Sequence, residues 1–193
     1  MTTLDTAQAH FVSRFGDCES QLADASPAWL APIRRAAIKR FAELGFPTRR
    51  NEAWKYTSVA EIAKASLDPE PPARDGVSSA DIHALLGSEA SQQWFVFEDG
   101  RFAPELSSDE ALPAGVEIEG LAAALGKHPE LIRPLLDRAE LLDRPFAALN
   151  DAFQRDGAFI RVTAGASPQR PIQLLFIASP GASGRVANPR NII

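Results

Sequence analysis

Two strand-like runs near the C-terminal end of the chain constrain its fold more than any other feature. In the first run, Ala158 to Thr163, small or branched apolar side chains alternate with Phe, Arg and Thr, which is the period of a strand. The second run, PIQLLFIA, covers residues 171 to 178, and little more than GASPQR separates the two. Parallel neighbours in one sheet need a crossover of about a dozen residues or more. The two runs therefore predict either a hairpin or successive turns of a β-solenoid.

The N-terminal part is predicted to be helical. Apolar residues from Leu4 to Phe15 recur at helical spacing, and Gly16 can close this helix in the left-handed conformation. A second helix has Ser26 as its cap and Pro27 in its first turn, and Gly45 ends it. Its apolar stripe consists of Leu30, Ile33, Ala37, Phe41 and Leu44. Its other face carries Arg34, Arg35, Lys39 and Arg40, which we interpret as a solvated basic face.

Shorter elements fill the middle of the chain. In chain order they are a helical turn with a capping box of Ser58 and Glu61, a flexible connection at 66–78, a short helix at 79–86, a β-hairpin turning at Asp99-Gly100, a strand and two short helices within 116–136, and a helix at 145–154. These elements include both helices and strands, and the predicted fold class is α+β.

The segment TRRNEAWKYT, residues 48 to 57, raises the question of nucleic-acid binding. Cations interleaved with Trp54 and Tyr56 are what a single-stranded nucleic acid requires, because bases stack on rings while cations meet phosphates. The chain nevertheless carries 20 Lys+Arg against 25 Asp+Glu, a net charge of -5 that repels polyanions. We therefore expect a structural fastener in which both rings are buried, Trp54 against the helix of residues 26 to 45. Arg49, Arg50 and Lys55 are expected to pair with Glu52 and nearby acids.

Catalytic, cofactor and metal sites are not predicted. Cys18 is alone, which excludes an intramolecular disulfide and a Cys-x-x-Cys pair, and His10, His83 and His128 lie far apart. Around Gly126-Lys127 the chain is similar to a phosphate loop, but the spacing is too long and His128 stands where Ser or Thr is required. No spacing typical of an enzyme is found, so we expect a non-enzymatic protein. Without an apolar run of about 20 residues or a secretion signal, it is expected to be cytoplasmic and not membrane-bound.

The sequence ends on NPRNII, residues 188 to 193, without a polar tail. From this we expect a strand at the end and the front part of a longer protein. The apolar residues of the last strands would then need cover from a second copy of the chain, or lie in a poorly ordered tail. These residues are Phe159, Leu175, Ile177, Ile192 and Ile193.

Several segments in register resemble the SufB/SufD family of the SUF iron-sulfur cluster assembly system. They are FPTRRNEAWKYTSV (46–59), WFVFEDGRFAPELS (94–107), PFAALNDAFQRDGAFIRV (145–162), PIQLLFIAS (171–179) and NPRNII (188–193). The residues that carry the family motifs are Pro47, Thr48, Arg49, Glu52, Trp54, Lys55, Tyr56, Asn150, Asp156 and Gly157. We interpret them as structural.

The resemblance implies a mainly helical N-terminal region with a β-hairpin, residues 1–144, which leads into the first strands of a right-handed parallel β-helix, residues 145–193. It implies a scaffold subunit that acts with SufB and the ATPase SufC, and the cluster would be handled by the full complex rather than held by this chain. SufB proteins often carry an N-terminal cysteine motif that Cys18 does not supply, which favours the SufD branch. The alternative is a nucleic-acid or protein-binding adaptor module that uses the basic helix face and TRRNEAWKYT.

Overall fold

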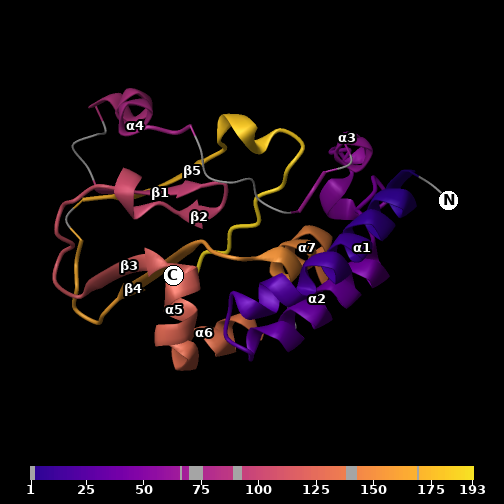
Figure 1. The fold of residues 1–193 in the computed structure, drawn as a ribbon, viewed down its shortest axis with the longest axis horizontal. Helices are drawn as coiled ribbons and strands as arrows, with labels where there is room; N and C mark the ends of the chain where they lie inside the picture. Colours follow the sequence, from indigo (N-terminus) through magenta and orange to yellow (C-terminus); the bar gives the residue numbers. More distant parts are fainter. Residues whose placement is uncertain (1–2, 66, 70–75, 89–92, 138–142, 169) are drawn as a thin grey trace.

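The computed structural model describes residues 3–65, 67–69, 76–88, 93–137, 143–168 and 170–193. Helices α1, α2 and α7 pack together at one end of the molecule, and the strands lie at the other (Figure 1). The helices of the described residues are α1 (Thr3–Asp24), α2 (Leu30–Leu44), α3 (Ala60–Lys64), α4 (Ser79–Leu86), α5 (Leu121–Lys127), α6 (Pro129–Leu136) and α7 (Pro145–Phe153). The strands are β1 (Gln93–Glu98), β2 (Arg101–Phe102), β3 (Val116–Gly120), β4 (Ala158–Val162) and β5 (Ile172–Ile177). The predicted α+β class is confirmed.

Helix α1 does not end at Gly16, as predicted, but continues to Asp24. Cys18 and Leu22 extend the buried stripe beyond Phe15, and both are almost fully buried. A glycine inside a helix costs about 1 kcal/mol. Burying one large apolar side chain stabilises by roughly 1.5–3 kcal/mol. The continued stripe therefore outweighs the glycine.

Helix α2 begins at Leu30 and not at Ser26. The Ser26 hydroxyl donates instead to the Leu22 carbonyl of α1, so the serine closes the first helix rather than opening the second. The predicted end at Gly45 is confirmed, with φ at 66°. Leu30, Ala37 and Phe41 of the predicted stripe are buried.

The helical end has an aromatic core. Phe11 of α1 lies edge-on to Phe41, Phe46 and Phe153 with ring centroids 5.9–6.3 Å apart, the geometry that the quadrupoles of aromatic rings favour. Phe153 is the last residue of α7, so this core joins residues 11 and 153 across most of the chain.

The predicted hairpin is confirmed as β1 and β2, with Phe97 opposite Phe102. Its turn residues Asp99 and Gly100 have φ angles of 50° and 79°, as a two-residue type I′ turn requires. Strand β5 adds to the other edge of β1 in parallel, from Gln93 opposite Ile172 to Glu98 opposite Ile177. The described residues show no strand on the outer edge of β5, and self-association there stays a prediction.

The hairpin considered for the runs at 158–163 and 171–178 is wrong. Strand β4 pairs antiparallel with β3, whereas β5 pairs with β1, so the two runs belong to different sheets. Beyond β3, strand β4 forms one parallel bridge, between Phe159 and Ile192. A parallel β-helix is not shown among the described residues.

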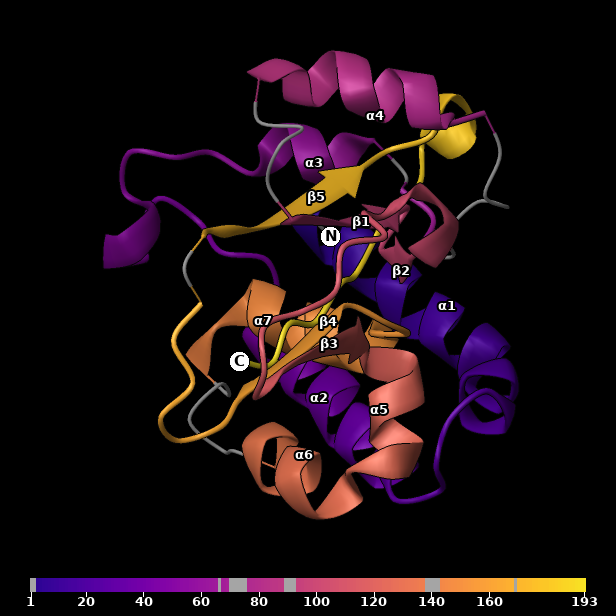
Figure 2. The ribbon, with the colours of Figure 1, turned by 90° about the vertical axis from the view of Figure 1, so that its left-hand side faces the viewer.

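The strand end of the molecule is layered. Trp94 and Val96 of β1 pack under α4, while Phe95 and Phe97 on the opposite face pack against β4. Figure 2 shows α4 above β1 and β5, with β3 and β4 below them. Phe159 points from β4 to the far side, into a cluster with α5 and α6. Because β1 is covered on both faces, every one of its residues is buried.

Two local predictions for the middle of the chain are wrong or only partly testable. Ser58 and Glu61 form no capping box, since α3 starts after Val59 without a side-chain cap. Of the predicted flexible connection, residues 66 and 70–75 lie outside the described residues. Asp68 is held by Gly184 and Val186 through backbone hydrogen bonds of 2.8 Å each. The short helix at 79–86 and the elements within 116–136 and 145–154 are confirmed.

The residues expected to need outside cover are mostly covered within the chain. Phe159 and Ile192 are buried together, with 3% and 7% of their surface exposed, which corrects the expectation for both. Leu175 and Ile177 are partly buried against the cluster under α4, and Ile193 is exposed. Residues 145–193 share helical packing and both sheets with the preceding part, and the boundary at 144/145 stays a prediction. No helix in the described ranges is long and apolar enough to cross a bilayer.

Candidate functional site

The motif segment of residues 48–57 begins where the chain leaves α2. Pro47 is buried beneath it. Thr48 and Asn51 then close a tight turn, in which the Thr48 amide donates to the Asn51 side-chain oxygen at 2.8 Å and the Asn51 amide donates to the Thr48 carbonyl at 3.0 Å. One 3₁₀ turn follows, Glu52–Trp54. The segment is therefore ordered by its own backbone and by short polar side chains.

Trp54 is half-buried and packs on Phe146 of α7, with ring centroids 5.1 Å apart. We had expected it to be largely buried against the helix of residues 26 to 45. Its aromatic neighbour lies instead on α7, at the edge of the helical core. Trp54 thus packs on a different partner from the one expected and is only half-buried.

Tyr56 corrects the prediction more strongly, because 90% of its surface is exposed. Arg49, Arg50 and Lys55 are exposed as well, and the Lys55 ammonium lies 5.6 Å from the centre of the Tyr56 ring. The expected ion pairs of these cations with Glu52 are not formed among the described residues. A 3₁₀ turn repeats about every three residues, so a ring at position 54 that points inward leaves positions 55 and 56 outside. We call Arg49, Arg50, Lys55 and Tyr56 the basic-aromatic surface.

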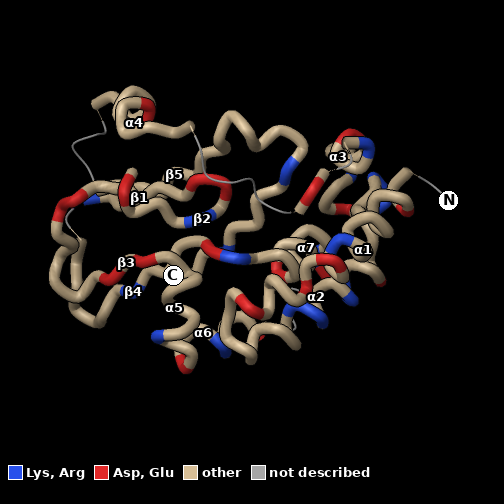
Figure 3. The backbone as a smooth tube through the Cα atoms, viewed as in Figure 1, with Lys and Arg blue, Asp and Glu red and all other residues tan. Residues whose placement is uncertain are grey.

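The basic face predicted for α2 is largely neutralised. Arg35 pairs with Glu19 of α1, and Arg40 pairs with Glu43 at 3.1 Å and with Asp143 at 2.6 Å. Figure 3 shows acidic and basic residues interspersed along α1 and α2. The helix face therefore does not extend the basic-aromatic surface into a continuous cationic groove.

Arg34, placed by the sequence analysis on that solvated face, is buried with 3% of its surface exposed. Its guanidinium donates to the Leu22 carbonyl at 2.8 Å, the Ser26 hydroxyl at 2.6 Å and the Gln154 carbonyl at 2.7 Å. Burial, and then the nearby Arg155 cation, lower the pKa of Arg34 to about 10. The sequence carried a signal for this burial, because position 34 lies one turn after Leu30 and one turn before Ile38, in phase with the apolar stripe.

The motif residues of the later segment have a different setting. Asn150, Asp156 and Gly157, which we call the C-terminal clamp, contact Pro189 and Arg190 near the end of the chain. The Asn150 amide donates to the Pro189 carbonyl at 3.0 Å, and the Arg190 amide donates to the Asp156 carbonyl at 2.9 Å.

Gly157 is required for this approach. Its φ is 150°, and a Cβ placed on it would lie 2.0 Å from the Arg190 carbonyl oxygen. Its own carbonyl accepts from the Leu121 amide at 2.8 Å. No other residue type fits this position without moving the backbone.

The Asp156 carboxylate joins two further elements to the clamp. One oxygen accepts from the Phe102 amide of β2 at 2.8 Å, and the other accepts from the Ala122 amide of α5 at 2.9 Å. Beside the clamp, Asp151 pairs with Arg190 at 3.3 Å. Burial raises the pKa of Asp151, and the Arg190 charge opposes that shift.

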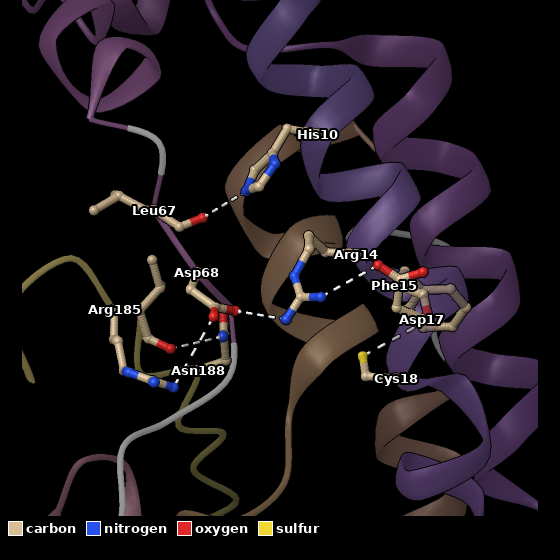
Figure 4. A network of polar contacts seen from close by, with 10 residues as sticks. His10, Arg14, Phe15, Asp17, Cys18, Leu67, Asp68, Arg185 and Asn188 are labelled. Atoms are coloured by element: carbon tan, nitrogen blue, oxygen red, sulfur yellow. Dashed lines mark hydrogen bonds and ion pairs between the residues drawn. The ribbon is translucent and has the colours of Figure 1, made fainter.

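A second polar network fastens α1 to two distant segments (Figure 4). Arg14 bonds Asp17 and Asp68 at 3.2 Å each, and Asp68 lies 4.0 Å from the Arg185 guanidinium. His10 contacts the Leu67 carbonyl at 3.0 Å. The network links residues that lie far apart in sequence.

Groups that could carry chemistry are otherwise dispersed. The described residues contain no cluster of three or more His, Cys, Asp or Glu side chains that could hold a metal ion. Cys18 is buried in α1, with its thiol directed to the Phe15 carbonyl. His83 bonds the Ser79 carbonyl, and His128 stacks on Phe159. Each of the three histidines thus bonds or stacks on another residue of the chain.

Comparison with known proteins gives one family. The model of the SufBD protein N-terminal region matches residues 5–174. An iron-sulfur cluster assembly SufBD family protein of Synechocystis sp. is 26% identical over 160 residues, which cover 83% of this chain and 35% of the relative. The iron-sulfur cluster assembly protein SufD of Bacillus subtilis is 24% identical over 157 residues, 78% of this chain and 35% of the relative. SufD of Escherichia coli is 25% identical over 169 residues, which cover 82% of this chain and 34% of the relative. The chain spans about a third of the length of these relatives.

Proposed function

The chain belongs to the SufBD family, and from that membership we propose that it is a non-enzymatic, cytoplasmic scaffold subunit of a SUF complex that assembles iron-sulfur clusters with SufB and the ATPase SufC. The observation that carries the proposal is the match of the family model to residues 5–174, supported by two relatives that are themselves named SufD. The absence of an N-terminal cysteine motif favours the role of SufD over that of SufB.

In this role the chain positions its partners and holds no cluster of its own. A cluster needs several exposed thiolate or imidazole ligands. The single thiol, Cys18, is 1% exposed inside the helical core, which supports a ligand set contributed by other parts of the complex.

We extend the proposal to a parallel β-helix that continues from the strands of this chain. Strand β5 pairs in parallel with β1, and the Phe159–Ile192 bridge is parallel too, with the Ile160 amide donating to the Ile192 carbonyl at 2.8 Å. Stacked parallel strands are how successive turns of a β-solenoid bury a common core.

We assign the basic-aromatic surface to an acidic face of a partner subunit. Its cations have no ion pairs among the described residues, and Tyr56 offers an exposed ring with a polar tip, which suits a protein interface. The nucleic-acid alternative has less support, because the net charge is -5 and three of the four cations of α2 are already paired or buried. Retention on heparin at physiological salt with a steep salt dependence would revive it.

The proposal is tested by co-expressing the full-length protein with SufB and SufC of the same organism. A tag on SufC should recover all three proteins, and gel filtration with light scattering should show them in one species. A control pull-down omits SufB. If the chain elutes alone while SufB and SufC remain together, the scaffold role is wrong.

A further inference from the structure

A pocket of about 210 Å³ lies where the end of α1, helix α2, strand β2 and the link between α7 and β4 meet. Leu22 and Ala122 form apolar parts of its wall. Pockets that take drug-sized ligands span roughly 300–1,000 Å³. This one is smaller, which limits an occupant to a small molecule or ion.

Positive charge predominates in the lining. Three guanidinium groups, those of Arg34, Arg101 and Arg155, border the pocket together with one carboxylate, that of Asp156. Both oxygens of that carboxylate already accept backbone amides, from Phe102 and Ala122. Asp156 therefore serves as a backbone anchor at the edge of the pocket.

Arg34 supplies a buried cation with no counter-ion among its hydrogen-bond partners. These partners, two carbonyl oxygens and one hydroxyl, are all neutral, and its buried Nε atom has no hydrogen-bond partner in the described part of the chain. A buried charge is ordinarily paired. The proximity of Arg155, which lowers the pKa of Arg34, adds repulsion between like charges. An anion between the two groups would remove both penalties.

We propose that this pocket binds a phosphate-sized oxyanion, with Arg34 and Arg155 as its main ligands. Arginine suits this occupant because its planar fork donates two hydrogen bonds to adjacent oxygens of a tetrahedral anion. The anion is either free phosphate or the phosphate group of a small ester, and both present the same oxygens. The site does not depend on the proposed SUF complex, since every lining residue belongs to this chain.

The test is calorimetric titration of the full chain with inorganic phosphate at constant ionic strength, set by chloride, and in parallel with glycerol 3-phosphate. Saturable binding with one anion per chain is expected in at least one titration, and the tighter ligand identifies the source of the phosphate group. No saturable heat with either ligand would overturn the proposal.

Two variants locate the site. Arg155→Gln should weaken binding by about tenfold or more, because a charge-assisted hydrogen bond is lost. Arg161→Gln is the matched control, as this arginine lies on β4 and pairs with Glu117 outside the pocket, and it should bind as the parent does. Arg34→Lys keeps the charge but loses the fork, and circular dichroism checks its fold. Equal binding in Arg155→Gln and the parent, or equal loss in Arg155→Gln and Arg161→Gln, would overturn the assignment.

Discussion

Residues 48–57 and residues 150–157 both carry motifs of the same family, yet they occupy opposite environments. In the first segment, Trp54 alone among the motif residues after Pro47 has substantial ring contact with the core, and Tyr56 is 90% exposed. In the second, Asp156 and Gly157 engage the backbone of β2, α5 and Arg190. A shared sequence motif thus contains one part that builds the fold and another that the fold presents to solvent.

The difference separates two reasons for a residue type to be required. Gly157 is needed because no Cβ fits beside Arg190, a constraint imposed by this chain's own backbone. Tyr56 meets no such constraint, and a large exposed ring with a cation close to it is typical of a surface that another molecule covers. Substitutions in the two segments should therefore differ in what they affect, folding in one and association in the other.

The largest loss of stability is expected from Gly157→Ala. The new methyl group would lie 2.0 Å from the Arg190 carbonyl oxygen at a φ of 150°, so the strand entry or residues 190–192 must move. We expect the free energy of unfolding to fall by about 3 kcal/mol or more, measured by urea denaturation. Gly181→Ala is the control, since a Cβ there meets nothing within 4 Å. Equal stability of the two variants would show that the clamp is not needed for folding.

Trp54→Ala should have the next largest effect. A fully buried aromatic costs roughly 3–5 kcal/mol on truncation. Because Trp54 is half-buried on Phe146, we expect the free energy of unfolding to fall by about 1–3 kcal/mol, as measured by thermal or urea denaturation. Tyr56→Ala, two positions away, is the matched control and should stay within about 0.5 kcal/mol of the parent. A similar loss for both variants would show that Trp54 and Tyr56 do not differ in their contribution to stability.

The features that could be predicted from the sequence are the local ones. The turn at Asp99-Gly100 and the apolar stripe of α2 were predicted because a turn type and a helical period depend on residues that are neighbours in sequence. The packing partner of Trp54 could not be predicted in this way, because Phe146 is brought to it only by the packing of α7 on α2. The same holds for Asp156, whose carboxylate contacts β2 and α5, and for the pairing of β5 with a strand about 80 residues earlier. The burial of Arg34 lies between these cases. Its position in the helical period matches the buried face of α2, whereas its charge led us to place it on the solvated face, which is wrong.

A smaller effect is expected in the pH dependence of stability, through the buried carboxylate of Asp151 beside the C-terminal clamp. Burial raises the folded-state pKa of Asp151 above its ordinary value of 3.8, so the folded protein binds more protons than the unfolded chain between these two values. The contribution of Asp151 to stability therefore falls as pH rises through that window. Asp151→Asn cannot titrate, so the stability of the parent relative to this variant should decrease as the pH rises above 3.8, as measured by urea denaturation at each pH. An increase would show that the ion pair with Arg190 dominates over burial.

The smallest effect on stability is expected at the basic-aromatic surface, where the largest effect on association should appear. Arg49→Glu with Lys55→Glu reverses two exposed charges that have no ion pairs among the described residues, so unfolding should stay within about 0.5 kcal/mol of the parent. Recovery of the double variant in the SufC pull-down should fall, because like charges would now face the acidic partner. The control is Lys39→Glu with Arg133→Glu, an equal reversal at exposed positions on α2 and α6. If both double variants assemble equally well, the exposed half of the motif is not the partner-binding surface. If the first one unfolds, the segment is a fastener after all, and the contrast with the clamp fails.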